Sequence, residues 1–189
     1  MTSRESHLVE LVDEAGTAIG SATVAEAHQA PGRLHRAFSV FLIDDQDRVL
    51  LQQRAAVKTR FPLRWGNSCC GHPEPGEPVT VAAVRRLGEE LGVGGVPLAE
   101  AGVHSYFAED PLTGRVEKEY DHVLVGRLPI STRFRPDPAE IARLLWVSVP
   151  DLQERLAGDP GSYAPWLTGV TDQLVSYLSR VVPERSGGR

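Results

Sequence analysis

The chain has 189 residues, of which 41% are hydrophobic and 24% charged, and its formal net charge is −5. These values are typical of one globular domain and exclude a disordered or fibrous chain, while the acidic balance disfavours a binder of nucleic acid. No apolar run approaches the ~18 residues needed to span a membrane, and the first residues lack the apolar core of a secretion signal. We therefore expect a cytoplasmic protein without membrane association.

The first half of the chain reads mainly as strands. Short β patterns cover residues 8–12 and 18–24, and a loop interrupted by Pro31 and Gly32 covers residues 28–35. Residues 37–43 and 49–54 are strongly apolar and are separated by a polar turn, which predicts a hairpin. An extended segment is expected over residues 65–71, followed by a loop rich in proline and glycine.

Helices and strands alternate in the second half. Apolar residues recur at three- and four-residue spacing over residues 78–91, which predicts a helix that ends at Gly92. A capping pattern at Asp137, Pro138 and Glu140 predicts a very short helix. The remaining expected elements are strands at 103–108, 120–128 and 144–147, a helix at 151–156 capped by Ser148, and a helix at 171–181.

The order of these elements indicates the fold class. Strands interleaved with few helices are typical of an α+β sandwich. We expect one domain over residues 1–182, with its core at about 35–165, because no repeat or linker divides the chain. Residues 183–189 are expected to form a disordered tail.

The most specific motif spans the predicted helix and the loop before it, and reads Gly71-x5-Glu77-x7-Arg85-Arg86-Leu87-Gly88-Glu89-Glu90-Leu91-Gly92-Val93. Such a loop and helix can direct several carboxylates at one Mg²⁺, an ion that prefers oxygen ligands and often shares them with phosphate. Taken alone, Arg85 with Glu89 and Arg86 with Glu90 are equally well explained as surface ion pairs. The glycines and Glu77 in register favour the metal-binding interpretation.

The segment Asn67-Ser-Cys-Cys-Gly-His-Pro73 joins directly to this motif and holds both cysteines of the chain. Neighbouring cysteines rarely bridge each other, so two free thiols are expected. Side chains alternate along an extended backbone, so Cys70 and His72 would face one way and Cys69 the other. Cys69 fits a buried apolar position, whereas Cys70, beside a histidine and a predicted metal loop, is expected to be an activated thiol.

A second group of candidate metal ligands is spread along the chain. Glu117 and Glu119 are two residues apart at the start of a strand, which puts both carboxylates on one face. Alone, a solvated strand edge explains them better. With His28, His35 and His72 they form a plausible ligand set for a divalent ion with mixed nitrogen and oxygen ligands.

Several motifs in the same order resemble one family. The loop-helix motif is similar to the Nudix box, with Arg86 in place of one glutamate as the single mismatch. Over about residues 8–166 the chain resembles the type I isopentenyl-diphosphate isomerases, a divergent Nudix branch in which that arginine is expected. The resemblance rests also on residues 28–39, Arg54-Ala…Lys58, residues 65–73 and Pro165-Trp166. It implies a Nudix-like α/β/α sandwich with mixed and antiparallel sheets.

The resemblance implies a role for each matching residue. Metal ligands are expected at His28, His35, His72, Glu117 and Glu119, and Glu90 is expected to bind Mg²⁺ together with the substrate diphosphate. The resemblance assigns diphosphate binding to Arg54, Lys58 and Arg86, and the isoprenoid tail to Trp166. The catalytic pair is expected to be Cys70 and Glu119, with Tyr106 near Glu119.

One position departs from the family pattern. Val24 stands where the family has a basic residue a few positions before the first metal histidine, so either another cation substitutes or diphosphate affinity is lower. Trp65 is an alternative to Trp166, although a packing role explains Trp65 at least as well. The metal at the histidine site stays open between Mn²⁺, Zn²⁺ and Mg²⁺, and the oligomeric state between monomer and homodimer.

The implied reaction of isoprenoid biosynthesis interconverts isopentenyl and dimethylallyl diphosphate by protonation and deprotonation, a 1,3-allylic shift. The proton donor and acceptor must lie on opposite faces of the allyl unit, and the order in which Cys70 and Glu119 act is open. An aromatic face can stabilise the carbocation.

The alternative is a Nudix pyrophosphohydrolase of a nucleoside diphosphate derivative, which shares the box but requires neither Cys70 nor three histidines. A non-catalytic Nudix-like binding scaffold is the remaining reading.

Overall fold

The computed structural model describes residues 4–181. Its strands and helices follow in this order: the 3₁₀ helix η1 (Arg4–Ser6), β1 (Leu8–Val12), β2 (Ala18–Thr23), α1 (Val24–Ala27), β3 (His35–Ile43), β4 (Arg48–Arg54), β5 (Trp65–Gly66), β6 (Cys69–Gly71), α2 (Val79–Leu91), β7 (Leu98–Glu109), β8 (Val116–Arg127), β9 (Ile141–Ser148), α3 (Val149–Gly158), the 3₁₀ helix η2 (Pro160–Ser162) and α4 (Leu167–Val181).

Strand β3 is the centre of the sheet. It pairs in parallel with β8 along its whole length, from His35 opposite Glu119 to Ile43 opposite Arg127. On its other side it pairs antiparallel with β6, where Ser39 lies opposite Cys70. The sheet extends through β7 beyond β8, through β1 and β2 at the N-terminal end, and through β4, β5 and β9. The sheet is therefore mixed, with both parallel and antiparallel pairs.

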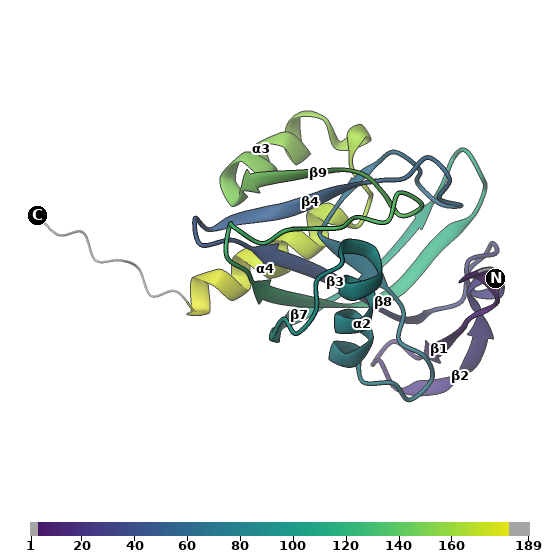
Figure 1. Ribbon diagram of the computed structural model, residues 1–189. Helices are drawn as coiled ribbons and strands as arrows, with labels where there is room; N and C mark the ends of the chain where they lie inside the picture. The colour runs from purple at the N-terminus through teal and green to yellow at the C-terminus, as the bar shows by residue number, and fades with distance from the viewer. Residues whose placement is uncertain (1–3, 182–189) are drawn as a thin grey trace, which may run out of the picture.

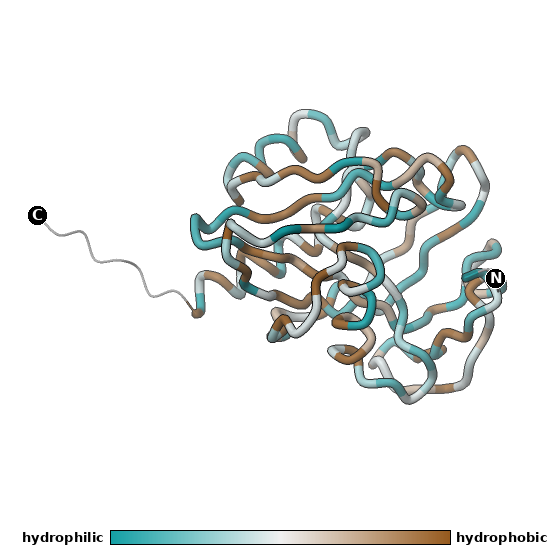
Figure 2. Tube along the Cα trace, in the orientation of Figure 1, coloured by the Kyte–Doolittle hydropathy of each residue, from teal (hydrophilic) through white to brown (hydrophobic). Residues whose placement is uncertain are grey.

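Helices cover both faces of this sheet (Figure 1). On one face α2 packs its buried residues, such as Leu87 and Leu91, against apolar side chains of β3 that include Phe38 and Leu42. On the other face α3 and α4 pack against a second apolar cluster. Both faces of the central strands are thus buried, which explains their long apolar runs, drawn brown in Figure 2. The predicted α+β sandwich is confirmed.

Several local predictions are confirmed. The helix predicted from apolar spacing is α2, and Gly92 ends it in the left-handed region with φ of 68°. Ser148 caps α3 by accepting a hydrogen bond from the backbone of Asp151 at 3.2 Å. The predicted strands are present, although β7 and β8 are longer than expected, and α4 begins at Leu167 rather than at residue 171.

Two local predictions are wrong. Strands β3 and β4 follow each other through a turn, but they pair only at Ile43 opposite Val49, because the segment of β5 and β6 lies between them: β6 pairs with β3, and β5 pairs with β4. No helix forms at Asp137–Glu140 within the described chain; this segment is a turn in which Asp137 accepts from the backbone of Ala139. The Glu140 side chain binds cations instead of capping. The predicted tail at residues 183–189 lies outside the described residues.

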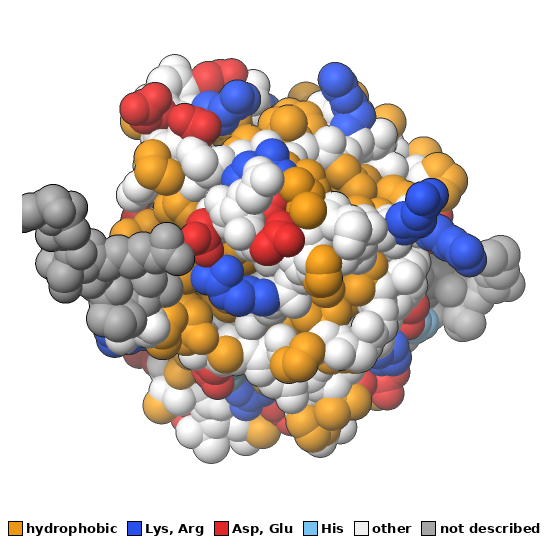
Figure 3. All heavy atoms as spheres, turned by 60° about the vertical axis from the view of Figure 1, so that its left-hand side comes forward, with side chains coloured by type: hydrophobic (Ala, Val, Ile, Leu, Met, Phe, Trp, Pro, Cys, Tyr) orange, Lys and Arg blue, Asp and Glu red, His pale blue; other side chains and the backbone are white. Residues whose placement is uncertain are grey.

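The surface carries charges of both signs. On the face drawn in Figure 3, apolar side chains are interspersed with acidic and basic ones. Over residues 4–181 there is no helix that is long and apolar enough to cross a membrane.

Candidate active site

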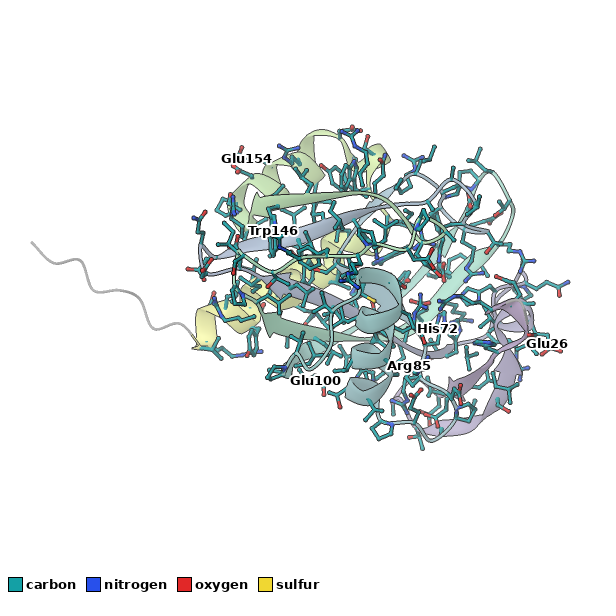
Figure 4. The ribbon with its side chains drawn as sticks, viewed as in Figure 1. Glu26, His72, Arg85, Glu100, Trp146 and Glu154 are labelled. Carbon is teal, nitrogen blue, oxygen red and sulfur yellow. The ribbon has the colours of Figure 1, made fainter. Side chains whose placement is uncertain are left out.

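A pocket lies beside the sheet, between β6, β8 and the N-terminal residues. Figure 4 shows His72, which follows β6, between α2 and the N-terminal strands. The pocket wall carries the predicted catalytic residues together with several cations. The lining includes Cys70, His72, Tyr106, Glu117, Glu119 and Trp166, and the basic residues Arg4, Arg54, Lys58, Arg60, Arg85 and Arg86.

The sheet register explains how distant residues meet here. His35 lies opposite Glu119 in the parallel pair of β3 and β8, and Cys70 reaches the same region from β6 on the other side of β3. His28 comes from the end of α1, whose start is fixed by a capping box between Thr23 and Glu26. Four segments of the chain thus converge on one point.

Three histidines and one carboxylate form a compact cluster. One ligand atom each from His28, His35, His72 and Glu119 lies within 4.8 Å of all the others. Oε1 of Glu119 lies 2.9 Å from His72 Nε2, 3.5 Å from His35 Nε2 and 3.8 Å from His28 Nε2. The predicted histidine set is therefore brought together, with Glu119 at its centre.

The tautomers of two histidines leave ring nitrogens that face the cluster. Nδ1 of His28 donates to the Val24 carbonyl, and Nδ1 of His35 donates to the Arg33 carbonyl, both at 2.7 Å. Each ring therefore has a lone pair on Nε2 when it is neutral. Both Nε2 atoms are buried, and carboxylate oxygens lie 2.8 Å from that of His28 and 3.5 Å from that of His35 without a regular hydrogen bond. Buried imidazole nitrogens that face carboxylates in this way fit metal ligation.

Glu117 stands beside this cluster. Its Oε2 lies 2.8 Å from His28 Nε2, and its Oε1 accepts a hydrogen bond from Arg60 at 3.1 Å. As predicted, Glu117 and Glu119 point to one face of β8, and both are buried. Glu117 is outside the compact set of four but close enough to His28 to share an ion with it.

Protonation states in the cluster follow from burial and charge. Burial disfavours the His28 imidazolium, yet the Glu117 carboxylate outweighs it and raises the pKa of His28 to about 9. Burial dominates at His72 and lowers its pKa to about 4, in spite of Glu119. At Glu119, burial is outweighed by the three histidine rings that surround the carboxylate, which hold its pKa well below the usual range. A proton on His28 therefore balances the carboxylates when no metal does.

The two cysteines occupy opposite faces, as alternation predicted. Cys69 is fully buried in the apolar cluster against α2. Cys70 is half-buried and reaches the pocket. The expectation of an activated thiol is wrong for this state: burial and the nearby Asp121 raise the pKa of Cys70 to about 12. Cys70 is therefore a protonated thiol, which suits a proton donor.

Tyr106 lies where the sequence placed it. Its hydroxyl donates to Glu119 Oε2 at 2.6 Å, from the neighbouring strand β7. Burial, followed by the charge of Glu119, raises the pKa of Tyr106 well above its usual value. Tyr106 thus stays a hydrogen-bond donor to the carboxylate.

Two of the three predicted diphosphate cations, Lys58 and Arg86, are already paired with carboxylates, whereas Arg54 donates to the backbone oxygens of Arg60 and Phe61. Lys58 lies 2.6 Å from Glu140 Oε2, and Arg86 donates to Glu89 at 2.7 Å and also to Glu90. Lys58 and Arg86 both line the pocket, so an anionic ligand there would compete with Glu140 and Glu89 for them.

Glu90 is buried and lies outside the pocket lining. Its oxygens accept hydrogen bonds from Arg86 and, at 3.2 Å, from Gln52. Burial raises the pKa of Glu90. A carboxylate is a suitable Mg²⁺ ligand, but here one of these hydrogen bonds would have to be exchanged for the ion.

Trp166, rather than Trp65, lines the pocket. The guanidinium carbon of Arg54 lies 5.3 Å from the centroid of the Trp166 ring, which is a cation–π contact. Trp65 is half-buried and packs against the apolar core. The ring face of Trp166 thus already accepts a cation.

Val24 also lines the pocket and is buried, so an apolar side chain stands at the position where the resemblance led us to expect a basic one. Two other cations reach the same pocket. Arg60 bonds Glu117 and Glu5, and Arg4 lies 2.9 Å from Glu140. Arg60 and Arg4 are therefore candidates for the cation that could substitute for a basic residue at position 24.

Some functional neighbours were not predicted. Asp121 is buried and accepts from Ser39 at 2.7 Å, while Ser39 lies 3.6 Å from the Cys70 sulfur. The period-two pattern Glu117, Glu119, Asp121 could have revealed it, because all three face one side of β8. No sequence signal joins Glu140 to Lys58, which are 82 residues apart.

Comparison with known proteins completes the description of the site. A NUDIX domain model matches residues 33–167. An isopentenyl-diphosphate Delta-isomerase of Nocardia farcinica is 60% identical over 164 residues, which are 87% of this chain and 92% of that protein. One of Streptomyces coelicolor is 51% identical over 168 residues, which are 89% of this chain and 83% of that protein.

Solved structures share the fold at much lower identity. A crystal structure from Deinococcus radiodurans has a TM-score of 0.68 at 19% identity, and covers 88% of this chain and 98% of its own. The MutT protein of Methanosarcina mazei Go1 has a TM-score of 0.57 at 15% identity, with 75% and 93% covered. These two likenesses concern the fold alone.

Proposed function

This chain belongs to the Nudix family and, within it, to the isopentenyl-diphosphate Delta-isomerases, and from that premise we propose how its residues act. The reaction is the interconversion of isopentenyl and dimethylallyl diphosphate by addition of a proton at one end of the allyl unit and removal of a proton at the other. The diphosphate is retained throughout.

One observation carries the assignment of roles: a protonated thiol and an ionised carboxylate line one pocket from strands on opposite sides of β3. The pKa of Cys70 is raised and that of Glu119 is lowered. The thiol can therefore donate a proton, and the carboxylate can accept one. In the direction from isopentenyl diphosphate, Cys70 would protonate the terminal carbon and Glu119, held by Tyr106, would take the proton from the carbon next to the diphosphate-bearing one.

The carbocation between these steps needs shielding and a π face. Trp166 lines the pocket with an indole ring that already accepts the Arg54 guanidinium. We assign the isoprenoid tail to this ring, where a desolvated cation–π contact contributes on the order of 2 kcal/mol. The apolar side chains around Trp166 exclude water from the cation.

The metal is assigned to the histidine cluster. His28, His35, His72 and Glu119 would hold it, with Glu117 as a fifth candidate. Three imidazoles with carboxylates suit Zn²⁺ or Mn²⁺ better than Mg²⁺, which prefers oxygen ligands. When bound, the ion supplies positive charge that fixes the Glu119 carboxylate and alters its basicity.

The diphosphate is assigned to the basic side of the pocket. Arg54, Lys58 and Arg86 would bind it, with charge-assisted hydrogen bonds that replace those to Glu140 and Glu89. Glu90 would take part through Mg²⁺ brought with the substrate, after exchange of its Arg86 or Gln52 hydrogen bond. The net charge of the chain does not oppose this, because the cations are concentrated at the pocket.

The competing function is hydrolysis of a nucleoside diphosphate derivative. The purified protein with isopentenyl diphosphate, Mg²⁺ and Mn²⁺, followed by proton and phosphorus NMR, separates the two. We expect dimethylallyl diphosphate with no free phosphate. Release of phosphate from nucleoside diphosphate derivatives, without isomerisation of isopentenyl diphosphate, would overturn the proposal.

A further inference from the structure

Asn67 is fully buried in the link between β5 and β6, and it contacts two residues of the site. Its side-chain nitrogen donates to the backbone oxygens of Val40 at 3.2 Å and Cys69 at 2.9 Å. Because only a nitrogen can donate to two carbonyl oxygens, the orientation of the amide is fixed. Its Oδ1 then faces away from β3 and toward the site.

That oxygen accepts two hydrogen bonds. The Cys70 thiol lies 3.1 Å from it, and the indole nitrogen of Trp166 also lies 3.1 Å from it. All hydrogen-bonding positions of the Asn67 amide are therefore used, two toward the sheet and two toward the site. One buried atom joins the proposed proton donor to the proposed aromatic wall, although their positions are 96 residues apart in sequence (166 minus 70).

Among residues 4–181, neither Cys70 nor Trp166 has a second hydrogen-bond partner equivalent to the Asn67 oxygen. The Trp166 indole can only donate, and its residue is buried. The other polar neighbour of the Cys70 sulfur is Ser39, at 3.6 Å, whose hydroxyl donates to Asp121. Without the Asn67 oxygen, the thiol is therefore free to turn toward Ser39, and the indole loses its acceptor.

We propose that Asn67 is a positioning residue for the isomerisation: its single oxygen fixes the Cys70 thiol relative to the Trp166 ring, so that both meet the hydrocarbon tail in one geometry. The inference rests on the proposed function, which assigns the thiol and the ring to the reacting part of the substrate. The hydrogen bonds of the Asn67 amide go to Val40, Cys69, Cys70 and Trp166, and none goes to Arg54, Lys58 or Arg86, so it acts on the chemical step rather than on diphosphate binding.

Asn67→Ala tests this in steady-state kinetics with isopentenyl diphosphate. A misplaced reacting group costs about a hundredfold in rate, so kcat should fall about a hundredfold. KM should change less than about threefold, because the diphosphate contacts remain.

Ser68→Ala is the matched control. Ser68 is the adjacent, fully buried residue; its hydroxyl donates to Leu50 and accepts from Leu42, both through the backbone. It has no hydrogen bond to Cys70 or Trp166. Ser68→Ala should lower the melting temperature about as much as Asn67→Ala while kcat stays within about threefold of wild type. An equal loss of kcat in both variants would reduce Asn67 to a structural residue and overturn the proposal.

A double-mutant cycle with Trp166→Phe tests the shared oxygen. The phenyl ring keeps an aromatic face but cannot donate to Asn67. Because both changes break the same arrangement, Asn67→Ala should lower kcat less in the Trp166→Phe background than in wild type. Independent, multiplicative effects, or an unchanged kcat in Asn67→Ala, would contradict the proposal.

Thiol labelling separates this inference from the proposed function. In a Cys69→Ala background, the rate of iodoacetamide labelling at Cys70 at one fixed pH reports the position of the thiol without any turnover. Asn67→Ala should change that rate about tenfold, whereas Ser68→Ala should not. An inactive wild type with this labelling pattern would refute only the proposed function; an active wild type with unchanged labelling would refute the role of Asn67.

Discussion

The sharpest contrast at the residue scale is between two adjacent cysteines. Alternation along the extended segment predicted that Cys69 and Cys70 face opposite sides, and the structure confirms it. The protonation state of Cys70 could not be predicted, because it depends on burial and on Asp121, which is 51 positions away (121 minus 70). Proximity to a metal loop suggested an activated thiol, whereas the folded environment keeps Cys70 protonated.

This contrast gives the first prediction. Cys70→Ala should lower kcat by about 10²–10⁴-fold or more, the usual contribution of a general acid or base. Cys69→Ala should leave kcat within about threefold and lower stability by about 1 kcal/mol, because it removes only a buried sulfur. Steady-state kinetics with far-UV circular dichroism as the fold check would decide. A greater loss of activity in Cys69→Ala would contradict the assignment.

The second prediction at this scale concerns proton release from His28. Its pKa of about 9 means that it is protonated at pH 7, whereas His72, with a pKa of about 4, is not. Metal binding at pH 7 should therefore release about one proton from His28, and this contribution should vanish as the pH rises above about 10. Titration calorimetry in buffers of different ionisation enthalpy measures it.

His104→Gln is the control for that measurement, since His104 is outside the cluster and should leave proton release unchanged. Metal binding without proton release at pH 7, or with a release that does not decline at alkaline pH, would contradict the protonated state of His28.

At the scale of elements, the predictions from local sequence patterns are confirmed for helices whose ends and buried faces depend on neighbouring residues. The spacing of apolar residues identified α2, and Ser148 identified the start of α3. The same reasoning failed at Asp137–Glu140, because Glu140 forms ion pairs with Lys58 and Arg4 from distant segments. Tertiary ion pairs thus overrode a capping signal that was plausible in isolation.

The end of α2 gives an element-scale prediction. Gly92 and Gly95 both have φ of 68°, where alanine costs about 1–2 kcal/mol. A Cβ at Gly92 would lie 2.9 Å from Cβ of Arg135, whereas a Cβ at Gly95 meets nothing within 4 Å. In urea unfolding, Gly92→Ala should lose at least about 1 kcal/mol more than Gly95→Ala. Equal losses would show that the contact with Arg135 relaxes freely.

At the scale of the whole molecule, the parallel pairing of β3 with β8 creates the site. It sets His35 beside Glu119, a contact between residues 84 positions apart (119 minus 35) that no local sequence pattern predicted. The resemblance to a family supplied the ligand set, but not the central place of Glu119 or the partners Asp121 and Asn67. Those follow only from the register of the folded sheet.

A metal that joins α1, β3, β6 and β8 should stabilise the whole fold. Because the cluster exists only in the native state, binding at a hundred times Kd contributes about 2.7 kcal/mol. For a chain of this length that corresponds to a rise in Tm of about 5–10 °C. His35→Ala should lose most of this Mn²⁺- or Zn²⁺-dependent rise, and His104→Ala should keep it. An equal rise in His35→Ala would place the metal elsewhere.

The central claim is that a thiol and a carboxylate in one pocket add a proton at one end of the allyl unit and remove a proton at the other, while the diphosphate is retained. Turnover of isopentenyl diphosphate in D₂O, followed by NMR of the product, tests it most directly. The account predicts dimethylallyl diphosphate with deuterium in a methyl group and no free phosphate. Product without deuterium, or phosphate release in place of isomerisation, would contradict it.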